Sequence, residues 1–386
     1  MRAWIALIGL VVVCAVPAAA SAGEPVPRPL AKAWIVVWSG DGEGGVLAQS
    51  SPGAVRPVAS LTKLMTAYLV LRYARLDAVT TTTKDAVAVG ESAVPLAVGE
   101  RQTVHDLLAA LVVHSANDAA VMLAHAVAAE PRARQAIALA VAEGGRPART
   151  PVARFVALMN AEARELHLRE TAYRTPYGLD VPGAHSSARD VLALSRLLMA
   201  DVRFRALARR SVVVIPGHRL SSRNGLLLHY RSLDGVKTGH TDDAGWNLAA
   251  HARRAGVEVY AIDLGAPTEQ RRDHDVARLL DWAFDHLPRA TAVRAGSVYG
   301  QLGTVRAIAG RSLVTLVSPT LRLHLRVVLP DRLDHRVKRG DRLGELRVTR
   351  LADGRELARI PLVADRAGGS DRSGLRNLWS RLGQVF

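Results

Sequence analysis

Hydrophobic and polar positions follow two different patterns along this chain, and the change comes close to residue 200. Between Thr66 and Met199 the sequence is rich in alanine and leucine at helical spacing. After Met199, short apolar runs typical of strands appear. These runs are Val212 to Ile215, Gly235 to Lys237, Trp246 to Ala252 and Val257 to Ile262. The pattern therefore predicts a helical region followed by a sheet.

Two further elements complete this predicted domain. Trp34 to Trp38 and Val46 to Gln49 flank a Gly/Asp-rich stretch and predict a hairpin. From Val276 to Leu287, apolar residues recur at helical spacing and predict an amphipathic helix that packs against the sheet. The expected fold class is α/β (α+β): an antiparallel sheet flanked by helices, with a helical subdomain. We expect it to span residues 23–288.

A strand pattern returns after Pro288. Leu321, Leu323, Leu325 and Val327 alternate with mostly polar residues, which indicates a half-buried strand. Asp353-Gly354 separates two further apolar runs and is a strong hairpin signal. The sequence therefore predicts a second, small all-β domain over residues 289–365.

Both ends of the chain carry special segments. Arg2, an apolar run from Ala3 to Val16 and the small residues Ala20-Ser21-Ala22 predict a secretory signal peptide over residues 1–22, with an uncleaved anchor as the alternative. A linker and an amphipathic helix are predicted over residues 366–386, where Leu375, Trp379 and Phe386 share one helical face. We expect this tail to lie in a membrane surface, although docking on the protein itself is the alternative. The expected location is the periplasm or the outer face of the cytoplasmic membrane.

Composition narrows the function classes. The single cysteine, Cys14, lies in the predicted signal peptide, so the mature chain has no thiol for catalysis, disulfides or metal binding. A net charge of +16 is compatible with nucleic acid, but the arginines are scattered and no nucleic-acid motif is present. We expect no nucleic-acid partner. An anionic membrane or wall polymer fits the charge better, unless the charge has no specific role.

Three short motifs carry the candidate chemistry: Ser60-Leu-Thr-Lys63, Ser115-Ala-Asn117 and Lys237-Thr-Gly239. If Ser60 opens a helix, Lys63 lies one turn later on the same face, within reach of the hydroxyl. A serine needs a nearby base to become a nucleophile, and a buried lysine can lose its proton whereas an arginine cannot. Each motif alone is weak, but their order and wide separation together indicate acyl transfer.

The chain thereby resembles the low-molecular-mass penicillin-binding proteins of the penicillin-binding protein 5/6 type, which are serine D-alanyl-D-alanine carboxypeptidases. The likeness runs from about Ala31 to Leu287 and includes His114 to Ala119 and Asp234 to Thr241. It implies a hydrolase that removes the terminal D-alanine from pentapeptide stems of peptidoglycan and is acylated by β-lactams. One departure is Ala116, which stands where the family usually has glycine.

The resemblance also implies the role of each residue. Ser60 is the expected nucleophile, Lys63 its base, and Ser115 a proton relay to the leaving amine. The N–H groups of Ser60 and His240 hold the oxyanion. The remaining residues expected to bind substrate are Asn117, Lys237, Thr238, Gly239, Arg223 and Arg272.

Other functions stay open. A class A β-lactamase shares the three motifs, but no E-x-x-L-N stretch for fast deacylation occurs. A D-Ala-D-Ala endopeptidase and a non-catalytic wall-binding protein would share the fold. No cofactor is expected, and no H-E-x-x-H or comparable metal spacing is present.

Overall fold

The computed structural model describes residues 4–12, 25–40, 43–144, 148–318 and 321–369. The chain consists of two compact units. Of the described residues, those in 25–40 and 45–286 form one unit, and those in 4–12, 43–44 and 287–369 form the other. The predicted limits of signal peptide, domains and tail stay predictions.

The first unit is built on a five-stranded antiparallel sheet. Its spatial order is β3-β2-β10-β9-β8. The strands are β2 (Ala33–Gly40), β3 (Glu43–Ser50), β8 (Leu233–Thr241), β9 (Gly245–Arg254) and β10 (Val257–Ala266). Their alternation of β-branched and small residues suits a sheet that is covered on both faces, and β10 is buried along almost its whole length. The third motif lies on β8, at the free edge of this sheet.

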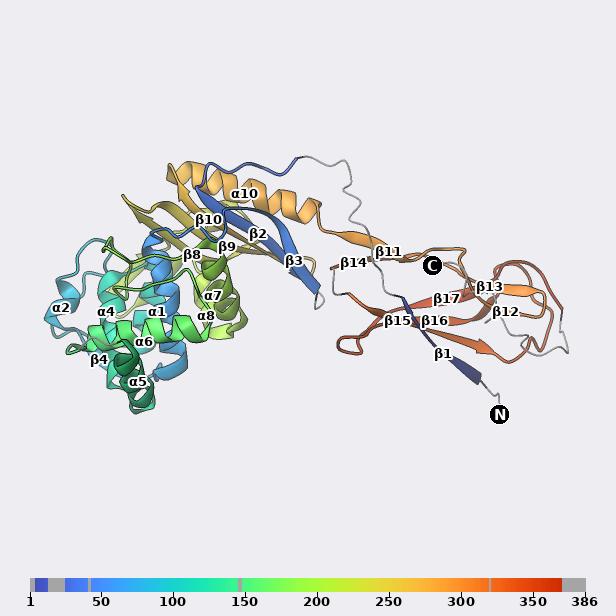
Figure 1. Cartoon of the computed structure of the whole chain (residues 1–386), viewed down its shortest axis with the longest axis horizontal. Helices are drawn as coiled ribbons and strands as arrows, with labels where there is room; N and C mark the ends of the chain where they lie inside the picture. The colour runs from blue at the N-terminus through green and yellow to red at the C-terminus, as the bar shows by residue number, and fades with distance from the viewer. Residues whose placement is uncertain (1–3, 13–24, 41–42, 145–147, 319–320, 370–386) are drawn as a thin grey trace. The chain divides into compact units, whose positions relative to one another are not determined.

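Helices cover both faces of the sheet, as the sequence predicted. On one face, α10 (Glu269–Asp285) packs against β9 and β10. Its residues Val276, Leu279 and Leu280 are fully buried, which confirms the predicted apolar stripe. On the other face lie α7 (Ala188–Ala200) and α8 (Val202–Ala208). Figure 1 shows α10 on the opposite side of the sheet from α7 and α8.

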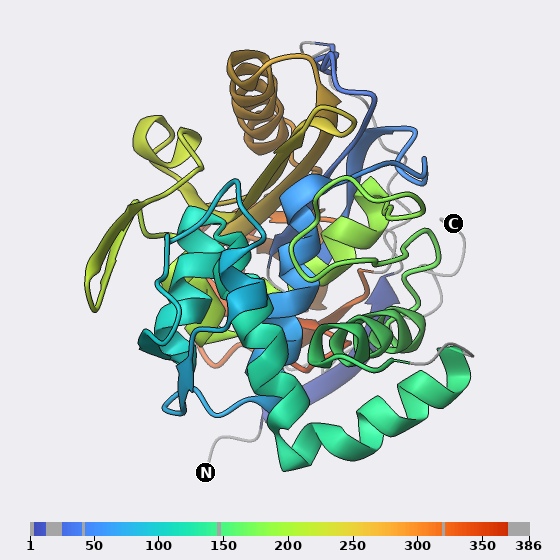
Figure 2. The same cartoon turned by 90° about the vertical axis from the view of Figure 1, so that its left-hand side faces the viewer.

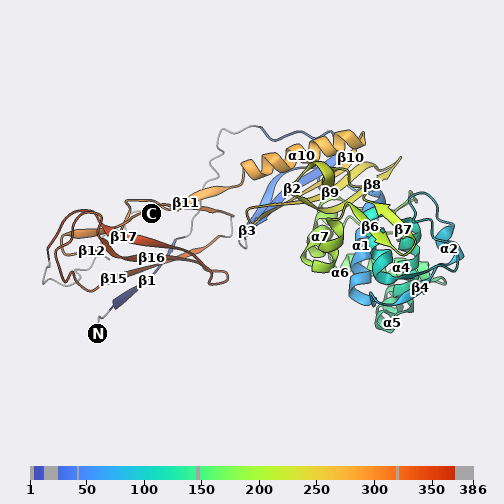
Figure 3. The same ribbon diagram turned by 180° about the vertical axis from the view of Figure 1, so that it is seen from behind.

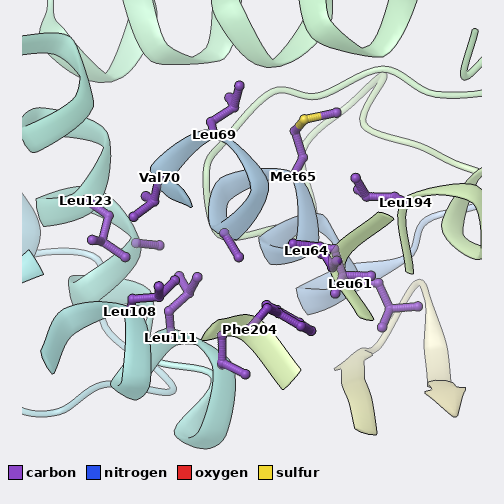
Figure 4. Close-up of a cluster of buried hydrophobic side chains, with 14 of the residues drawn as sticks. Leu61, Leu64, Met65, Leu69, Val70, Leu108, Leu111, Leu123, Leu194 and Phe204 are labelled. Atoms are coloured by element: carbon purple, nitrogen blue, oxygen red, sulfur yellow. The ribbon is translucent and has the colours of Figure 1, made fainter. Parts of the chain in front are cut away.

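The helical region surrounds α1 (Lys63–Tyr73), the helix that begins with the lysine of the first motif. The other helices there are α2 (Lys84–Val87), α3 (Val104–Ala109), α4 (Asn117–Ala129), α5 (Arg134–Gly144) and α6 (Pro151–Glu165). Leu64, Met65 and Leu69 of α1 pack with Leu108, Leu111 and Leu123 of its neighbours (Figure 4). This core fixes α1, and with it the first motif, between the helical region and the sheet.

One strand expected in the sheet lies elsewhere. Val212–Ile215 is a strand, β6, but it pairs with β7 (His218–Ser221) as a separate two-stranded hairpin. Figure 3 shows this hairpin beside the helical region. Because Gly217 has a φ of +78° between the two strands, the turn closes locally, so β6 pairs with its neighbour in sequence. Two short strands, β4 (Val79–Thr81) and β5 (Arg101–Thr103), and the one-turn helix α9 (Leu226–His229) complete the unit.

The second unit is all β, as predicted. Its larger sheet has the order β1-β15-β16-β17-β13-β12, and β11 pairs with β14. The strands are β1 (Trp4–Val12), β11 (Arg289–Val293), β12 (Val298–Leu302), β13 (Val305–Ala309), β14 (Leu313–Leu316), β15 (Leu323–Pro330), β16 (Arg342–Arg350) and β17 (Glu356–Ala364). Leu323, Leu325 and Leu346 lie in its own hydrophobic core. The predicted Asp353-Gly354 turn joins β16 to β17, with Gly354 at a φ of +69°.

The predicted membrane tail, Leu375 to Phe386, lies outside the described residues. Within the described part of the chain, no helix has both the length and the apolar character needed to cross a bilayer.

Candidate active site

The first motif lies on a short turn that is tightly held from two sides. Ala59–Thr62 forms a single 3₁₀ turn, which continues into α1 at Lys63. A Cβ on Gly239 of β8 would come within 2.8 Å of the Val58 carbonyl oxygen and 3.1 Å of the Ser60 nitrogen. A Cβ on Gly178 would come within 2.1 Å of the Ala59 carbonyl oxygen. The turn that presents Ser60 therefore rests against backbone on both sides, where only glycine fits.

Lys63 is the centre of the site. Its side chain is only 1% exposed, and its Nζ lies 2.8 Å from Ser60 Oγ, 2.7 Å from Asn117 Oδ1 and 2.8 Å from the Tyr177 carbonyl oxygen. The structure thus brings the first motif and the asparagine of the second into direct contact through one amine. Figure 2 shows the green loop that follows α6, which contains Tyr177, next to the blue helix α1.

The partners of Lys63 indicate which way its protons point. Asn117 Oδ1 and the Tyr177 carbonyl oxygen are acceptors only, so each takes one N–H of the amine. A neutral amine has two N–H groups and one lone pair in tetrahedral directions, and Ser60 Oγ occupies the third direction. In the neutral form the serine O–H therefore donates to Nζ, which is the geometry that a general base requires.

Burial and a neighbouring charge favour that neutral form. Burial lowers the pKa of Lys63 well below its ordinary value, and the positive charge of Lys237 lowers it further. The carboxylates of Glu91 and Asp118 act in the opposite direction on the same pKa. The net effect favours the neutral amine, which is the form that is able to accept a proton.

The second motif lies at a junction between helical segments, as the sequence predicted. Ser115 follows the π-helical turn η2 (Ala110–His114) and has left-handed backbone angles, with φ 65° and ψ 29°. This residue reverses the chain, so that α4 begins at Asn117 in a new direction. Ser115 is buried, and Ala116 is fully buried at the start of α4.

A loop locks Asn117 in place. Its Nδ2 donates to the Gly90 carbonyl oxygen at 3.2 Å, and its backbone N–H donates to the Ser92 carbonyl oxygen at 2.6 Å. The carboxylate of Asp118 accepts hydrogen bonds from the backbone N–H groups of Val94 and Leu96 in the same loop. Because Nδ2 is committed to a carbonyl, the Asn117 side-chain oxygen faces Lys63.

The third motif brings positive charge to the edge strand. Lys237 is 3% exposed and donates to the Thr238 carbonyl oxygen at 2.9 Å. Burial lowers its pKa to about 7, with further lowering by the positive charges of Arg223 and Arg272. The two arginines that the sequence singled out therefore lie within electrostatic reach of this lysine.

The two arginines are held differently. Arg272, on α10, is 1% exposed, pairs with Asp273 at 2.7 Å and Glu269 at 3.1 Å, and lies over the Trp246 ring at 5.6 Å. Arg223 is exposed, and its backbone N–H donates to the Val113 carbonyl oxygen in the turn before Ser115. Arg272 is thus fixed in place, whereas Arg223 presents its side chain toward solvent.

His240 follows the third motif on β8. Its ring stacks on Trp246 with centroids 3.9 Å apart. This contact gives the imidazole a structural role, in keeping with a contribution to the reaction through its backbone only.

Sequence reasoning missed three parts of the site. The Tyr177 carbonyl carries no residue-type signal, because every residue has one. Gly178 and the loop residue Glu91 also went unnoticed; a Tyr-Gly pair in a loop was the only available hint. Among the described residues, no group of three or more His, Cys, Asp or Glu side chains is arranged to hold a metal ion.

Comparison with known proteins identifies the family. A family model described as D-alanyl-D-alanine carboxypeptidase, Peptidase S11, matches residues 20–134 and 132–268. The chain belongs to this family. The resemblance inferred from the motifs is therefore confirmed.

Individual relatives agree with this assignment. The D-alanyl-D-alanine carboxypeptidase DacD of Salmonella typhimurium is 34% identical over 73% of this chain and 70% of its own length. DacD of Escherichia coli is 34% identical over 67% of this chain and 64% of its own length. The chain thus spans about two thirds of the length of each of these two relatives.

A solved structure covers more of the chain. The crystal structure of penicillin-binding protein 6B from Escherichia coli superposes with a TM-score of 0.59 and 30% identity, over 88% of this chain and 97% of the other. Its coverage extends beyond the first unit. The predicted fold class, a penicillin-binding domain followed by a small all-β domain, is confirmed.

Proposed function

We propose that this protein is a serine D-Ala-D-Ala carboxypeptidase that removes the terminal D-alanine from stem peptides of peptidoglycan. One observation carries the proposal. The buried Nζ of Lys63 lies within hydrogen-bonding distance of two acceptors, Asn117 Oδ1 and the Tyr177 carbonyl oxygen. Its remaining direction, which holds the lone pair of a neutral amine, faces the Ser60 hydroxyl 2.8 Å away. This arrangement supplies a base and a nucleophile in a dry site, and membership of the family names the bond that they cleave.

The acylation half of the reaction uses the first two motifs. Lys63 takes the proton from Ser60, and Oγ attacks the carbonyl carbon of the penultimate D-alanine. The N–H groups of Ser60 and His240 hold the oxyanion of the tetrahedral intermediate, a type of contact that is worth about 3 kcal/mol for each donor. Ser115 passes a proton to the leaving amine, so that the peptide bond breaks and free D-alanine departs.

Deacylation reverses these proton movements. A water molecule gives its proton to the base, attacks the ester carbon and releases the shortened peptide, and Ser60 regains its proton. β-Lactams enter the same first step, because they present a strained amide to Ser60. Their acyl-enzyme then blocks the site.

The third motif and the two arginines bind the carboxylate end of the substrate. Lys237, Arg223 and Arg272 provide positive charge near Thr238, whose hydroxyl is able to donate to a carboxylate oxygen. Asn117 completes substrate binding next to Lys63. Recognition of a free C-terminal carboxylate is what distinguishes a carboxypeptidase from an endopeptidase.

Two measurements on the purified protein test this function. Incubation with a pentapeptide ending in D-Ala-D-Ala should yield a product lighter by one alanine residue in mass spectrometry. Penicillin should form a covalent adduct on the peptide that contains Ser60, and Ser60→Ala should abolish it. An adduct that survives in Ser60→Ala would show that another residue is the nucleophile.

We also propose that the protein is located on the outer face of the cytoplasmic membrane. It is supported by the signal-like segment of residues 1–22 and by the amphipathic pattern of Leu375 to Phe386. A substrate in the cell wall also requires an exported enzyme. The tail, with tryptophan and phenylalanine on one side and arginine on the other, suits the interface of an anionic bilayer.

A further inference from the structure

Positive charge is concentrated in the second unit. Residues 287–369 contain 16 lysine and arginine residues against 7 aspartate and glutamate residues, a net charge of +9. Residues 25–286 are far more numerous and contain 31 against 26, a net charge of +5. All residues of the proposed active site lie in the first unit. The charge of the small β unit is therefore a surface property that the reaction does not explain.

Part of this charge forms a row across the larger sheet. Arg326 of β15 lies directly opposite Arg347 of β16, and Arg347 lies directly opposite Arg359 of β17. Residues opposite each other on neighbouring strands point to the same face of a sheet, and the strands are about 4.8 Å apart. The three arginines, which we call the arginine row, thus cross three neighbouring strands, β15, β16 and β17 (Figure 1). None of them lies on β1, the strand within the predicted signal peptide.

The arginine row points away from the hydrophobic core of the second unit. Leu325, Leu346 and Ile360 each adjoin one of the three arginines in sequence, and all three lie in that core. Since successive side chains of a strand point to opposite faces, the arginines occupy the outer face of the sheet. Arg326 and Arg359 are exposed, and the third arginine is partly exposed. The row is therefore accessible to a large partner.

Acidic neighbours neutralise the arginine row only in part. Glu345 accepts a hydrogen bond from Arg347 at 2.7 Å, and Glu356 accepts one from Arg359 at 2.6 Å. Each guanidinium has five N–H donors, so both paired arginines keep donors for a further anion. Among the described residues, Arg326 has no hydrogen-bond or ion-pair partner. The row therefore keeps a net positive charge and unused donors.

The end of the described chain indicates which anion meets this face. Gly368 exchanges two backbone hydrogen bonds with Val337, at 2.9 and 3.0 Å, so the chain is fixed to the second unit up to that point. The predicted membrane tail begins at Leu375, and the short segment between them spans at most about 25 Å when fully extended. When the tail lies in a bilayer surface, the second unit is therefore close to the lipid headgroups.

We propose that the arginine row is a docking surface for the headgroups of anionic phospholipids, through which the second unit contacts the membrane that holds the tail. Guanidinium groups bind phosphate oxygens through paired N–H donors, and a row on a sheet presents these donors together. Salt screens such contacts, so the row adds to the affinity of the tail and does not replace it. The inference rests on the proposed membrane location and is independent of the proposed chemistry.

Vesicle binding by the signal-processed, full-length chain tests the docking surface. One set of vesicles contains phosphatidylcholine alone, and the other contains phosphatidylcholine and phosphatidylglycerol in equal amounts. The ratio of the two partition coefficients measures the preference for anionic lipid. Arg326→Gln should lower this ratio about fivefold at low salt, and Arg326→Gln/Arg347→Gln/Arg359→Gln should lower it by more than about tenfold. Binding to the neutral vesicles, which reports on the tail, should stay the same.

Two matched variants separate the arginine row from net charge and from folding. Arg132→Gln/Arg134→Gln/Arg169→Gln removes the same charge from exposed positions of the first unit, and we expect the ratio to stay as in the unmodified chain. Replacing the three arginines of the row by lysine keeps the charge and should restore most of the preference. Thermal unfolding of every variant identifies any loss of binding that comes from a loss of structure.

The outcomes separate this inference from the proposals before it. An equal fall in the ratio for the row variant and the first-unit variant, or no fall in either, would overturn the docking surface and leave the tail as the anchor. Loss of binding to isolated cell-wall polymer in the row variant, with an unchanged vesicle ratio, would also overturn it, because the row would then serve a polymer. Failure of the unmodified chain to bind either vesicle would overturn the membrane location as well. Hydrolysis of a D-Ala-D-Ala peptide tests the proposed chemistry separately.

Discussion

At the scale of single residues, the charge of Lys237 changes close to neutral pH. Burial, with Arg223 and Arg272, lowers the pKa of Lys237 to about 7, whereas the pKa of Lys63 is lowered by burial and by Lys237 itself. As the pH falls, Lys63 gains a proton and loses its function as a base. As the pH rises through about 7, Lys237 loses the charge that attracts the carboxylate of the substrate.

Two substitutions at Lys237 should therefore change the pH profile in opposite ways. Lys237→Gln removes the charge that keeps Lys63 neutral, so the acidic limb of kcat/KM should move to higher pH by about one unit. Lys237→Arg keeps a charge at every pH, so the acidic limb should stay and the alkaline rise in KM should disappear. Both effects are measured by determining kcat/KM and KM as functions of pH, with the same D-Ala-D-Ala peptide for every variant. An acidic limb that does not move in Lys237→Gln would show that burial alone sets the protonation of Lys63.

The contact between Gly178 and the nucleophile's turn gives a second residue-scale prediction. Gly178→Ala places a methyl group 2.1 Å from the Ala59 carbonyl oxygen, so the turn must move. We expect a loss of about 3 kcal/mol in the free energy of unfolding and a large fall in the rate of penicillin acylation. Thermal or denaturant unfolding and stopped-flow acylation measure these two quantities.

Gly217→Ala is the matched control for that substitution. Gly217 also has a left-handed φ, +78° against +90° for Gly178, but a methyl group there meets nothing within 4 Å. It should cost only about 1 kcal/mol for backbone strain and leave acylation intact. Equal losses in both variants would mean that strain, and not the clash with Ala59, explains the effect.

At the scale of elements, the start of α4 depends on one buried carboxylate. Asp118 accepts from the backbone N–H groups of Val94, Leu96 and Ala119, and so ties the loop that holds Asn117 to the helix. Asp118→Asn turns an amide NH₂ toward these donors, which should cost about 2 kcal/mol of stability and slow acylation as Asn117 loosens. Asp85→Asn, at an exposed carboxylate paired with His125, should change neither quantity measurably. Unchanged acylation in Asp118→Asn would show that the loop does not position Asn117.

The start of α4 also shows which features of the structure could not be predicted from the sequence. Hydrophobic spacing was sufficient for α10 and for most strands of the sheet, because burial dictates residue type there. Motif spacing was sufficient to place Lys63 next to Ser60. It was not sufficient for the left-handed backbone of Ser115, the pairing of β6 with β7 or the Tyr177 carbonyl. These features depend on backbone conformation and on contacts between distant segments, which leave little trace in side-chain type.

At the scale of the whole molecule, all the proposed site residues belong to one unit, since they lie between Ser60 and Arg272. The predicted tail is far from them in sequence. Deleting residues 373–386 should therefore move the protein into the soluble fraction and leave hydrolysis of a soluble D-Ala-D-Ala peptide unchanged. Fractionation followed by a peptide assay measures both. Continued membrane association of the truncated, signal-processed protein would place the anchor elsewhere, with an uncleaved N-terminal segment as the leading alternative.

The glycine contacts around the turn that presents Ser60 also limit which substitutions can weaken acylation by β-lactams without damaging the enzyme. Gly178 and Gly239 leave no space for a side chain, so a mutation at either position damages the enzyme together with its affinity for the drug. We therefore do not expect selection by β-lactams to favour substitutions at Gly178 or Gly239. Val181 and Pro182, whose side chains are exposed, tolerate change far better. We therefore expect resistant alleles to accumulate in that loop and to spare the two glycines.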